Sequence, residues 1–316
     1  MRSRFSLLFA LGMAALLLVG CNGPLDVPPT PTPDPKAGPV LQNHQHGEGG
    51  PNGRLITRYG GPVAVDVATQ PANPAPTRPF TITYTLNDKN GKPVTGSGLT
   101  IVHERLMHLI VVSQDLTNFA HIHPVDEGNG SYVISDTVPS GGKYLMYNEF
   151  TTADGITQIE RDVLATDGAG AADTPASLTP DIGTKQEVDG VTAQLTTNSP
   201  KIRRRIPTHF FLDVSKNGQP VTDLEPFLGA PCHIVIISAD TKQFDHTHGD
   251  VPGGAMAGDM TTMNMATMAL PTPPAHFGPQ IQFTHTFMQP GAYRIWVQFG
   301  HDGKVVTVPY NVIVVN

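Results

Sequence analysis

The chain has 316 residues, including 30 prolines and 32 glycines, and only 15% of it is charged. This length suits two domains, and this composition favours short strands joined by turns over long surface helices. The formal net charge is -7 and no run of Lys and Arg forms a nucleic-acid-binding footprint, so we expect no nucleic-acid partner.

The N-terminus has the features of an export signal. Arg2 and Arg4 precede an apolar run from Phe5 to Val19. That run is shorter than the roughly 20 residues that a membrane-spanning helix needs. Residues 1–20 are therefore predicted to be a signal peptide.

The end of this segment carries a lipidation motif. Leu18-Val19-Gly20-Cys21 resembles the lipobox of bacterial lipoproteins. The resemblance implies cleavage before Cys21 and lipidation of that cysteine. It also implies an exported cell-envelope protein, anchored through its N-terminal lipid to the outer side of a bacterial membrane, either in the periplasm or on the cell surface. Cys232 is then left without a disulfide partner.

The remaining chain divides into four segments. Residues 21–58 are rich in proline and poor in large apolar groups, so we expect a disordered tether. From residue 59, apolar and polar residues alternate, which is typical of strands with one buried face. A stretch with few bulky residues, 166–188, predicts a linker between a first β-domain at 59–165 and a second at 189–316.

The two β-domains repeat one sequence. Residues 107–123, MHLIVVSQDLTNFAHIH, align without a gap with residues 232–248, CHIVIISADTKQFDHTH. Each copy is predicted to contain about seven short strands, which favours two tandem immunoglobulin-like β-sandwiches, with cupredoxin-like sandwiches as the alternative. Three histidines recur in the copies: His108, His121 and His123 in the first, and His233, His246 and His248 in the second.

Each repeat is predicted to fold as a tight hairpin. Such a hairpin places His108 opposite His123, and His121 shares the face of His123 because residues two apart in a strand point the same way. The same register brings together the three histidines of the second copy. Three imidazoles suit copper, zinc or nickel and leave a position open. The alternative interpretation is that these histidines are structural.

One residue before the first histidine, the two copies carry Met107 and Cys232. Strand alternation aims both side chains at the face opposite the histidines. We therefore expect them to pack inside the sandwiches.

The second copy contains an insertion, residues 250–274, that is rich in methionine. Thioethers bind Cu(I) and largely ignore Zn²⁺. The spacing M-x-x-M-x-M-x-x-M resembles the methionine motifs of extracytoplasmic copper-handling proteins, and the resemblance implies additional sulfur ligands for copper. The alternatives are a disordered loop or a methionine surface for a partner. The motif consists of Met260, Met263, Met265 and Met268.

These features predict a lipid-anchored, metal-binding protein outside the cytoplasm. Copper sequestration or delivery is the leading hypothesis, with zinc as the alternative metal and a copper donor or acceptor protein as partner. No catalytic triad, nucleophile elbow or phosphate-binding loop is visible, so we expect no enzyme. The alternative function is a structural or adhesive surface lipoprotein whose domains bind a protein. A copper-dependent redox enzyme with an open three-histidine site is a third hypothesis.

Overall fold

The computed structural model describes residues 61–168, 170–171, 176–254 and 272–316, which all belong to one compact unit, Leu41–Asn316. Apart from one short 3₁₀ helix, η1 (Gly96–Gly98), the regular structure of these residues is β. The described residues include no apolar helix of membrane-spanning length. The all-β prediction is confirmed. The signal peptide, Cys21, the whole tether and the four methionines of the motif lie outside the described residues.

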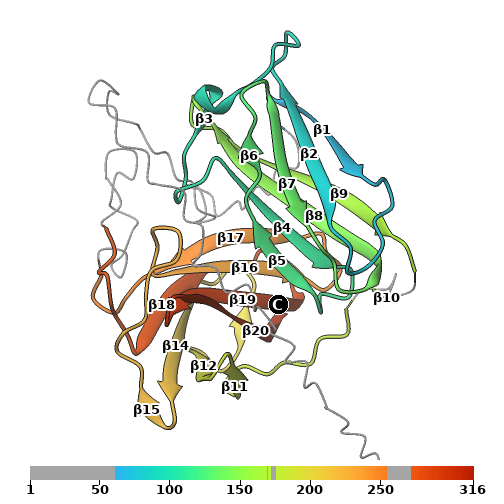
Figure 1. The fold of residues 1–316 in the computed structure, drawn as a ribbon. Coiled ribbons are helices and arrows are strands. Elements are labelled where there is room, and N and C mark those ends of the chain that lie inside the picture. Colours follow the sequence, from blue (N-terminus) through green and yellow to red (C-terminus); the bar gives the residue numbers. More distant parts are fainter. Residues whose placement is uncertain (1–60, 169, 172–175, 255–271) are drawn as a thin grey trace, which may run out of the picture. The chain divides into compact units, whose positions relative to one another are not determined.

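The first half of the described chain forms two sheets (Figure 1). Its strands are β1 (Ala64–Gln70), β2 (Phe80–Asn87), β3 (Leu99–Thr100), β4 (Met107–Ser113), β5 (Phe119–Ile122), β6 (Val125–Asp126), β7 (Ser131–Asp136), β8 (Gly141–Thr152), β9 (Thr157–Thr166) and β10 (Gly170–Ala171). One sheet has the order β1-β2-β7-β6. In the other, β9 pairs with β8, which is followed by β4 and β5. This is the ABED and CFG arrangement of an immunoglobulin-like sandwich.

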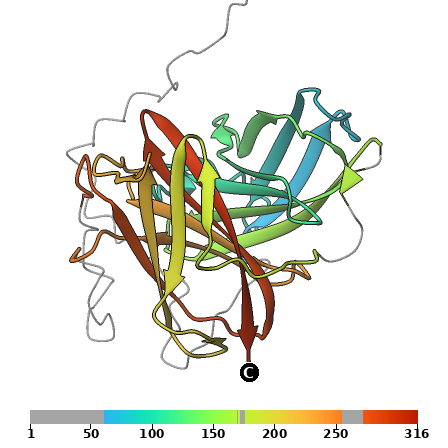
Figure 2. The ribbon, with the colours of Figure 1, turned by 90° about the horizontal axis from the view of Figure 1, so that it is seen from below.

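The second half repeats this plan (Figures 1 and 2). Its strands are β11 (Lys185–Val188), β12 (Val191–Thr197), β13 (Ile202–Arg203), β14 (Thr208–Lys216), β15 (Gln219–Pro220), β16 (Cys232–Ser238), β17 (Phe244–Gly249), β18 (Gln280–His285), β19 (Gly291–His301) and β20 (Lys304–Val315). The order β20-β19-β16-β17 matches β9-β8-β4-β5, and β12, β14 and β18 form the core of the facing sheet. The prediction of tandem immunoglobulin-like sandwiches is confirmed.

The alternation of apolar residues produces the inner faces of the sandwiches. In β2, every second residue is buried, beginning with Phe80, while the residues between are half-buried. β2 ends in a turn that contains Gly91, and β14 ends in the equivalent turn of the second sandwich, which contains Gly218. Both glycines have positive φ, 77° and 76°, which a residue with a Cβ adopts less readily. The repeated Asn-Gly dipeptides therefore determine where these strands turn.

The two repeated strands, β4 and β16, are buried on both faces. Met107 packs in the core of the first sandwich and Cys232, a free thiol, in the core of the second, which confirms their expected packing role. On the opposite faces, apolar side chains of the two sandwiches form a third core. We call this shared interface the seam. Its buried apolar residues are Ile110, Val112, Leu116, Leu145, Tyr147, Val235, Ile237, Phe244 and Trp296.

The seam has approximate twofold symmetry within one chain. Phe119 stacks on Trp296 with ring centroids 4.8 Å apart, and Phe244 stacks on Tyr147 with centroids 4.4 Å apart. Phe119 and Phe244 are equivalent in the repeats, as are Tyr147 and Trp296. The two sandwiches therefore contact each other through equivalent residues, as the subunits of an isologous dimer do.

Candidate metal centre

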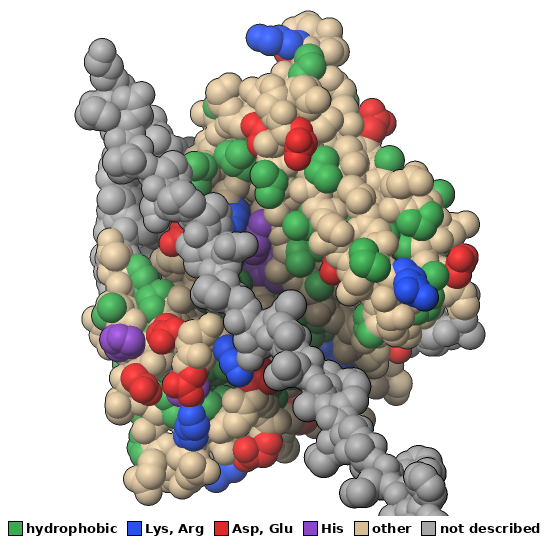
Figure 3. All heavy atoms as spheres, viewed as in Figure 1, with side chains coloured by type: hydrophobic (Ala, Val, Ile, Leu, Met, Phe, Trp, Pro, Cys, Tyr) green, Lys and Arg blue, Asp and Glu red, His purple; other side chains and the backbone are tan. Residues whose placement is uncertain are grey.

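The repeated histidines of the two copies lie against each other at the seam, where the ring centroids of His108 and His246 are 5.1 Å apart and those of His121 and His233 are 5.6 Å apart. Figure 3 shows that some histidine side chains (purple) reach the surface of the molecule. Both predicted hairpins form, β4 with β5 and β16 with β17. His233 pairs with His248, as predicted. The register Leu109 to Ile122 leads in the same way to His108 and His123. The hairpins therefore present the histidines of both copies to the same interface.

The three histidines of each copy lie close together, as expected: Nδ1 of His233 is 3.1 Å from Nε2 of both His246 and His248, and His108 contacts His121 and His123. The structure also joins the two copies, because two groups of three histidines that could hold an ion each take residues from both copies. Within each group, one nitrogen of every ring lies within 4.8 Å of the others. The reason is that the seam places the two hairpins against each other, which hairpin geometry alone does not predict. The first triad is His108, His121 and His246, and the second triad is His103, His233 and His248.

The orientation of His108 in the first triad follows from its hydrogen bond. Its Nε2 lies 3.0 Å from the carbonyl oxygen of Val102. Because a carbonyl oxygen only accepts, Nε2 carries the proton of the neutral ring. The lone pair of His108 is therefore on Nδ1, which lies 3.1 Å from Nε2 of His121.

The other two rings of the first triad are held in the same way. Nδ1 of His121 donates to Oε1 of Gln298 over 2.8 Å, and Nδ1 of His246 donates to Oε2 of Glu149 over 3.2 Å. Both rings therefore keep their lone pair on Nε2. Acceptors of this kind orient metal-binding histidines and increase the basicity of the free nitrogen.

The first triad thus directs lone pairs at one another. Nδ1 of His108 and Nε2 of His121 are 3.1 Å apart with no proton between them. A tetrahedral ion with nitrogen ligands at about 2.0–2.1 Å separates those ligands by about 3.3 Å. The spacing fits a shared cation, and a cation removes the repulsion between the lone pairs.

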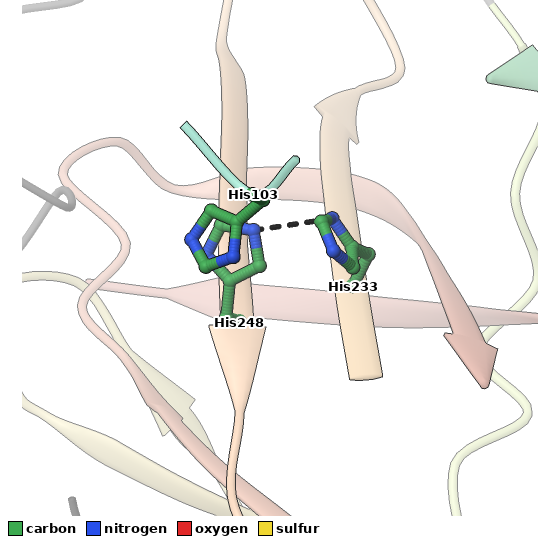
Figure 4. Close-up of side chains that lie close together, drawn as sticks. All are labelled: His103, His233 and His248. Carbon is green, nitrogen blue, oxygen red and sulfur yellow. Dashed lines mark hydrogen bonds between the residues drawn. The ribbon is translucent and has the colours of Figure 1, made fainter. Parts of the chain in front are cut away.

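The second triad is shown in Figure 4. Nδ1 of His233 lies 3.1 Å from Nε2 of His248. The ring of His103 stacks on that of His248 with centroids 3.5 Å apart, and it meets His233 edge-on at 5.2 Å. His233 is fully buried, and its Nε2 has no hydrogen-bond partner among the described residues. This ring is therefore not satisfied by the protein alone.

Sequence reasoning missed His103 because that residue has no histidine counterpart in the repeat. Its equivalent is Leu228, and both residues have positive φ, 45° and 49°, in the tight turn before the central strand. The one available signal was a histidine five positions before His108. The repeat pattern therefore did not indicate His103 as a ligand.

His123 belongs to neither triad. Its ring centroid is 5.0 Å from that of His108, and its Nε2 is buried without a hydrogen-bond partner among the described residues. His123 and His108 form the counterpart of the pair His248 and His233. The third member is absent because Leu228 stands where the other side has His103.

Burial controls the protonation of these rings. Desolvation, helped by the nearby His246, lowers the pKa of His108 to about 4. Desolvation followed by the influence of His108 lowers the pKa of His123 to about 2. Burial also holds the pKa values of His121 and His233 well below the usual range. At neutral pH these imidazoles are uncharged, which is the form that binds metals.

Three solved structures that are similar to this chain have low sequence identity to it. The adhesin FdeC of Escherichia coli is 15% identical with a TM-score of 0.25, over 80% of this chain and 64% of its own. The Yersinia pseudotuberculosis adhesin InvE is 10% identical with a TM-score of 0.24, over 79% and 60%. The fibronectin(III)-like modules of Clostridium thermocellum CbhA are 9% identical with a TM-score of 0.20, over 80% and 93%. The chain spans less than two thirds of either adhesin, and scores this low carry no argument about function.

No curated protein matches the chain in sequence. One family model, described as a domain of unknown function (DUF8832), matches residues 61–167 and 186–316. These two stretches contain nearly all of both sandwiches and the histidines of both triads. Because the matched residues make up more than half of the sequence, the chain belongs to the DUF8832 family.

Proposed function

We propose that this protein binds a transition metal ion at the seam through His108, His121 and His246, and that it sequesters or delivers copper outside the cytoplasm. The proposal depends on one observation: Nδ1 of His108 and Nε2 of His121 are 3.1 Å apart, and their lone pairs face each other. A buried polar cluster of this kind is costly unless a cation or proton occupies it.

Copper is preferred to zinc for two reasons. A site made of three imidazoles binds divalent copper more tightly than zinc, according to the general order of divalent metal affinities. The methionine motif beyond residue 254 resembles those of copper-handling proteins and would supply ligands for Cu(I). Zinc is the alternative, because three histidines are also a common zinc ligand set.

Delivery needs an ion that can leave. Three protein ligands leave one position of a tetrahedral ion open to a donor or acceptor protein. Membrane anchoring through Cys21 would keep such a carrier in the envelope. This partner and this location are part of the proposal.

The test is a calorimetric titration of the purified chain with Cu²⁺ and, separately, with Zn²⁺. The His246→Ala variant is expected to lose at least 10-fold in copper affinity, because it removes one of three ligands. His276→Ala is the matched control, since His276 is exposed and belongs to neither triad. Equal copper affinity in the wild type and the His246→Ala variant would show that the first triad is not the site.

The alternative function is a structural or adhesive surface protein whose domains bind a protein partner. It is favoured by the hydrogen bonds of His121 to Gln298 and of His246 to Glu149, which join the two sandwiches without an ion. In that case, replacing His121 destabilises the fold, while added copper leaves the melting temperature unchanged. Thermal unfolding with and without copper therefore separates the two functions.

A further inference from the structure

Resting on the proposed function, we infer that the seam holds two metal ions rather than one, and that the second ion binds His103, His233 and His248. The two triads share no residue, so both can be filled at once. Each has its three nitrogens within 4.8 Å.

An independent observation supports a ligand at the second triad. His233 is fully buried, and its Nδ1 lies 3.1 Å from Nε2 of both His246 and His248. A single proton on Nδ1 can serve only one of these contacts well, and Nε2 has no partner among the described residues. An ion bound between Nδ1 of His233 and Nε2 of His248 would replace a contact that one shared proton serves poorly.

The two ions lie close together. His233 of the second triad and His246 of the first are in contact, with 3.1 Å between their nitrogens. Two dications at this range repel each other, and the carboxylate of Glu149, 3.2 Å from His246, offsets part of that charge. The centre is therefore a coupled pair of ions rather than two remote sites.

The two sites are not equivalent. The rings of the first triad are held by Val102, Gln298 and Glu149. In the second triad, His103 comes from a loop, and both His103 and His248 are half-buried. The second ion is therefore held by a less rigid and more accessible set of ligands. We expect it to bind more weakly and to exchange faster than the first.

Approximate symmetry does not give the second triad a counterpart with three histidines. The counterpart of the second triad consists of His108, His123 and the position of Leu228, which has no nitrogen in its side chain. His103 is thus the residue that completes a three-histidine metal site on one side of the seam, where the equivalent position on the other side is Leu228. Leucine at position 103 would restore the symmetry, which makes His103→Leu a conservative test.

The experiment loads the purified full chain with Cu²⁺, removes excess ion by gel filtration and counts bound copper per chain. Electron paramagnetic resonance then detects magnetic coupling between neighbouring ions. The wild type is expected to retain two ions per chain with a coupled spectrum. The His103→Leu variant is expected to retain one ion with an uncoupled spectrum, and His276→Leu, an exposed control, to retain two.

The outcomes distinguish this inference from the proposed function. One ion in both the wild type and His103→Leu, lost in His121→Ala, overturns the second site and leaves the first. No retained copper in the wild type overturns both. If His103→Leu does not fold by circular dichroism, His248→Gln takes its place, and two coupled ions in that variant count against the second site.

Discussion

Glu149 and Gln298 occupy equivalent places in the two sandwiches, and each accepts a hydrogen bond from a histidine of the opposite repeat. Glu149 accepts from His246, and Gln298 accepts from His121. Glu149 on β8 and Gln298 on β19 therefore each orient a histidine ligand that belongs to the other sandwich. One side of the seam carries a charge and the other does not.

This asymmetry makes Glu149→Gln an informative variant. The amide can still accept from Nδ1 of His246, but the negative charge that increases the basicity of that ring is lost. Changes to such supporting groups typically cost 10–100-fold in metal affinity, and we expect about 10-fold here because the hydrogen bond is kept. Competition titration with a copper chelator measures the change.

The control for that variant is Glu127→Gln, which removes the same charge at an exposed position. Its copper affinity is expected to match that of the wild type. Equal losses in both variants would mean that net charge, rather than the contact with His246, sets the affinity.

Copper should stabilise the fold, because the first triad takes ligands from both sandwiches and forms only when they are docked. An ion that binds the folded chain alone adds about 2.7 kcal/mol to the free energy of unfolding at 100 times its dissociation constant. Differential scanning calorimetry should show a higher melting temperature with copper, reversed by a chelator. His246→Ala should show a much smaller rise, and an equal rise in that variant would place the stabilising ion elsewhere.

The apolar part of the seam should carry much of the docking energy. Ile110 is fully buried between the sandwiches, and truncation of such a residue to alanine typically costs about 2–5 kcal/mol. Ile110→Ala should therefore lower the free energy of unfolding by that amount. It should also change the fluorescence of Trp296, the one tryptophan in the chain, which lies in the same core.

Ile156→Ala is the matched control for Ile110→Ala, because Ile156 is 42% exposed. A change within about 0.5 kcal/mol is expected there. If the two variants lose similar stability, the seam is not a cohesive interface in solution.

Much of this fold was predictable from local pattern. The alternation in β2 indicated a strand and the repeated Asn-Gly dipeptides indicated turns, and the hairpin of β16 and β17 was predicted from its spacing. The continuous apolar run of β4 also held a signal, because both of its faces are buried. The apolar run does not indicate which surface packs against the outer face of β4. The grouping of His246 with His108 in one triad was therefore not predictable.

The pH dependence of stability should reveal the buried state of His108. The pKa of this ring is about 4 in the folded protein and about 6.5 in an unfolded chain. Below pH 6.5 the unfolded state therefore binds more protons than the folded state, and the stability falls as the pH drops to about 4. Well below pH 4, the difference between the two pKa values of His108 alone lowers the free energy of unfolding by about 3 kcal/mol.

A second titratable group, the half-buried Asp245, acts in the opposite direction. Burial, together with nearby Glu149, raises the pKa of Asp245 to about 7, so this carboxyl group favours the folded state as the pH falls. The measurement must therefore compare variants rather than follow the wild type alone. His108→Gln removes the imidazole and leaves Asp245 in place.

Urea unfolding of the metal-free wild type and His108→Gln at pH 7.5 and pH 4.5 isolates the contribution of His108. At pH 7.5 the variant has lost a buried neutral ring with its hydrogen bond to Val102 and is expected to be the less stable. At pH 4.5 the wild type has lost stability through His108 and the variant has not, so the difference between them should shrink by roughly 2–3 kcal/mol. A constant difference across this range would mean that His108 is accessible to protons in the folded protein, and that the seam is open in solution.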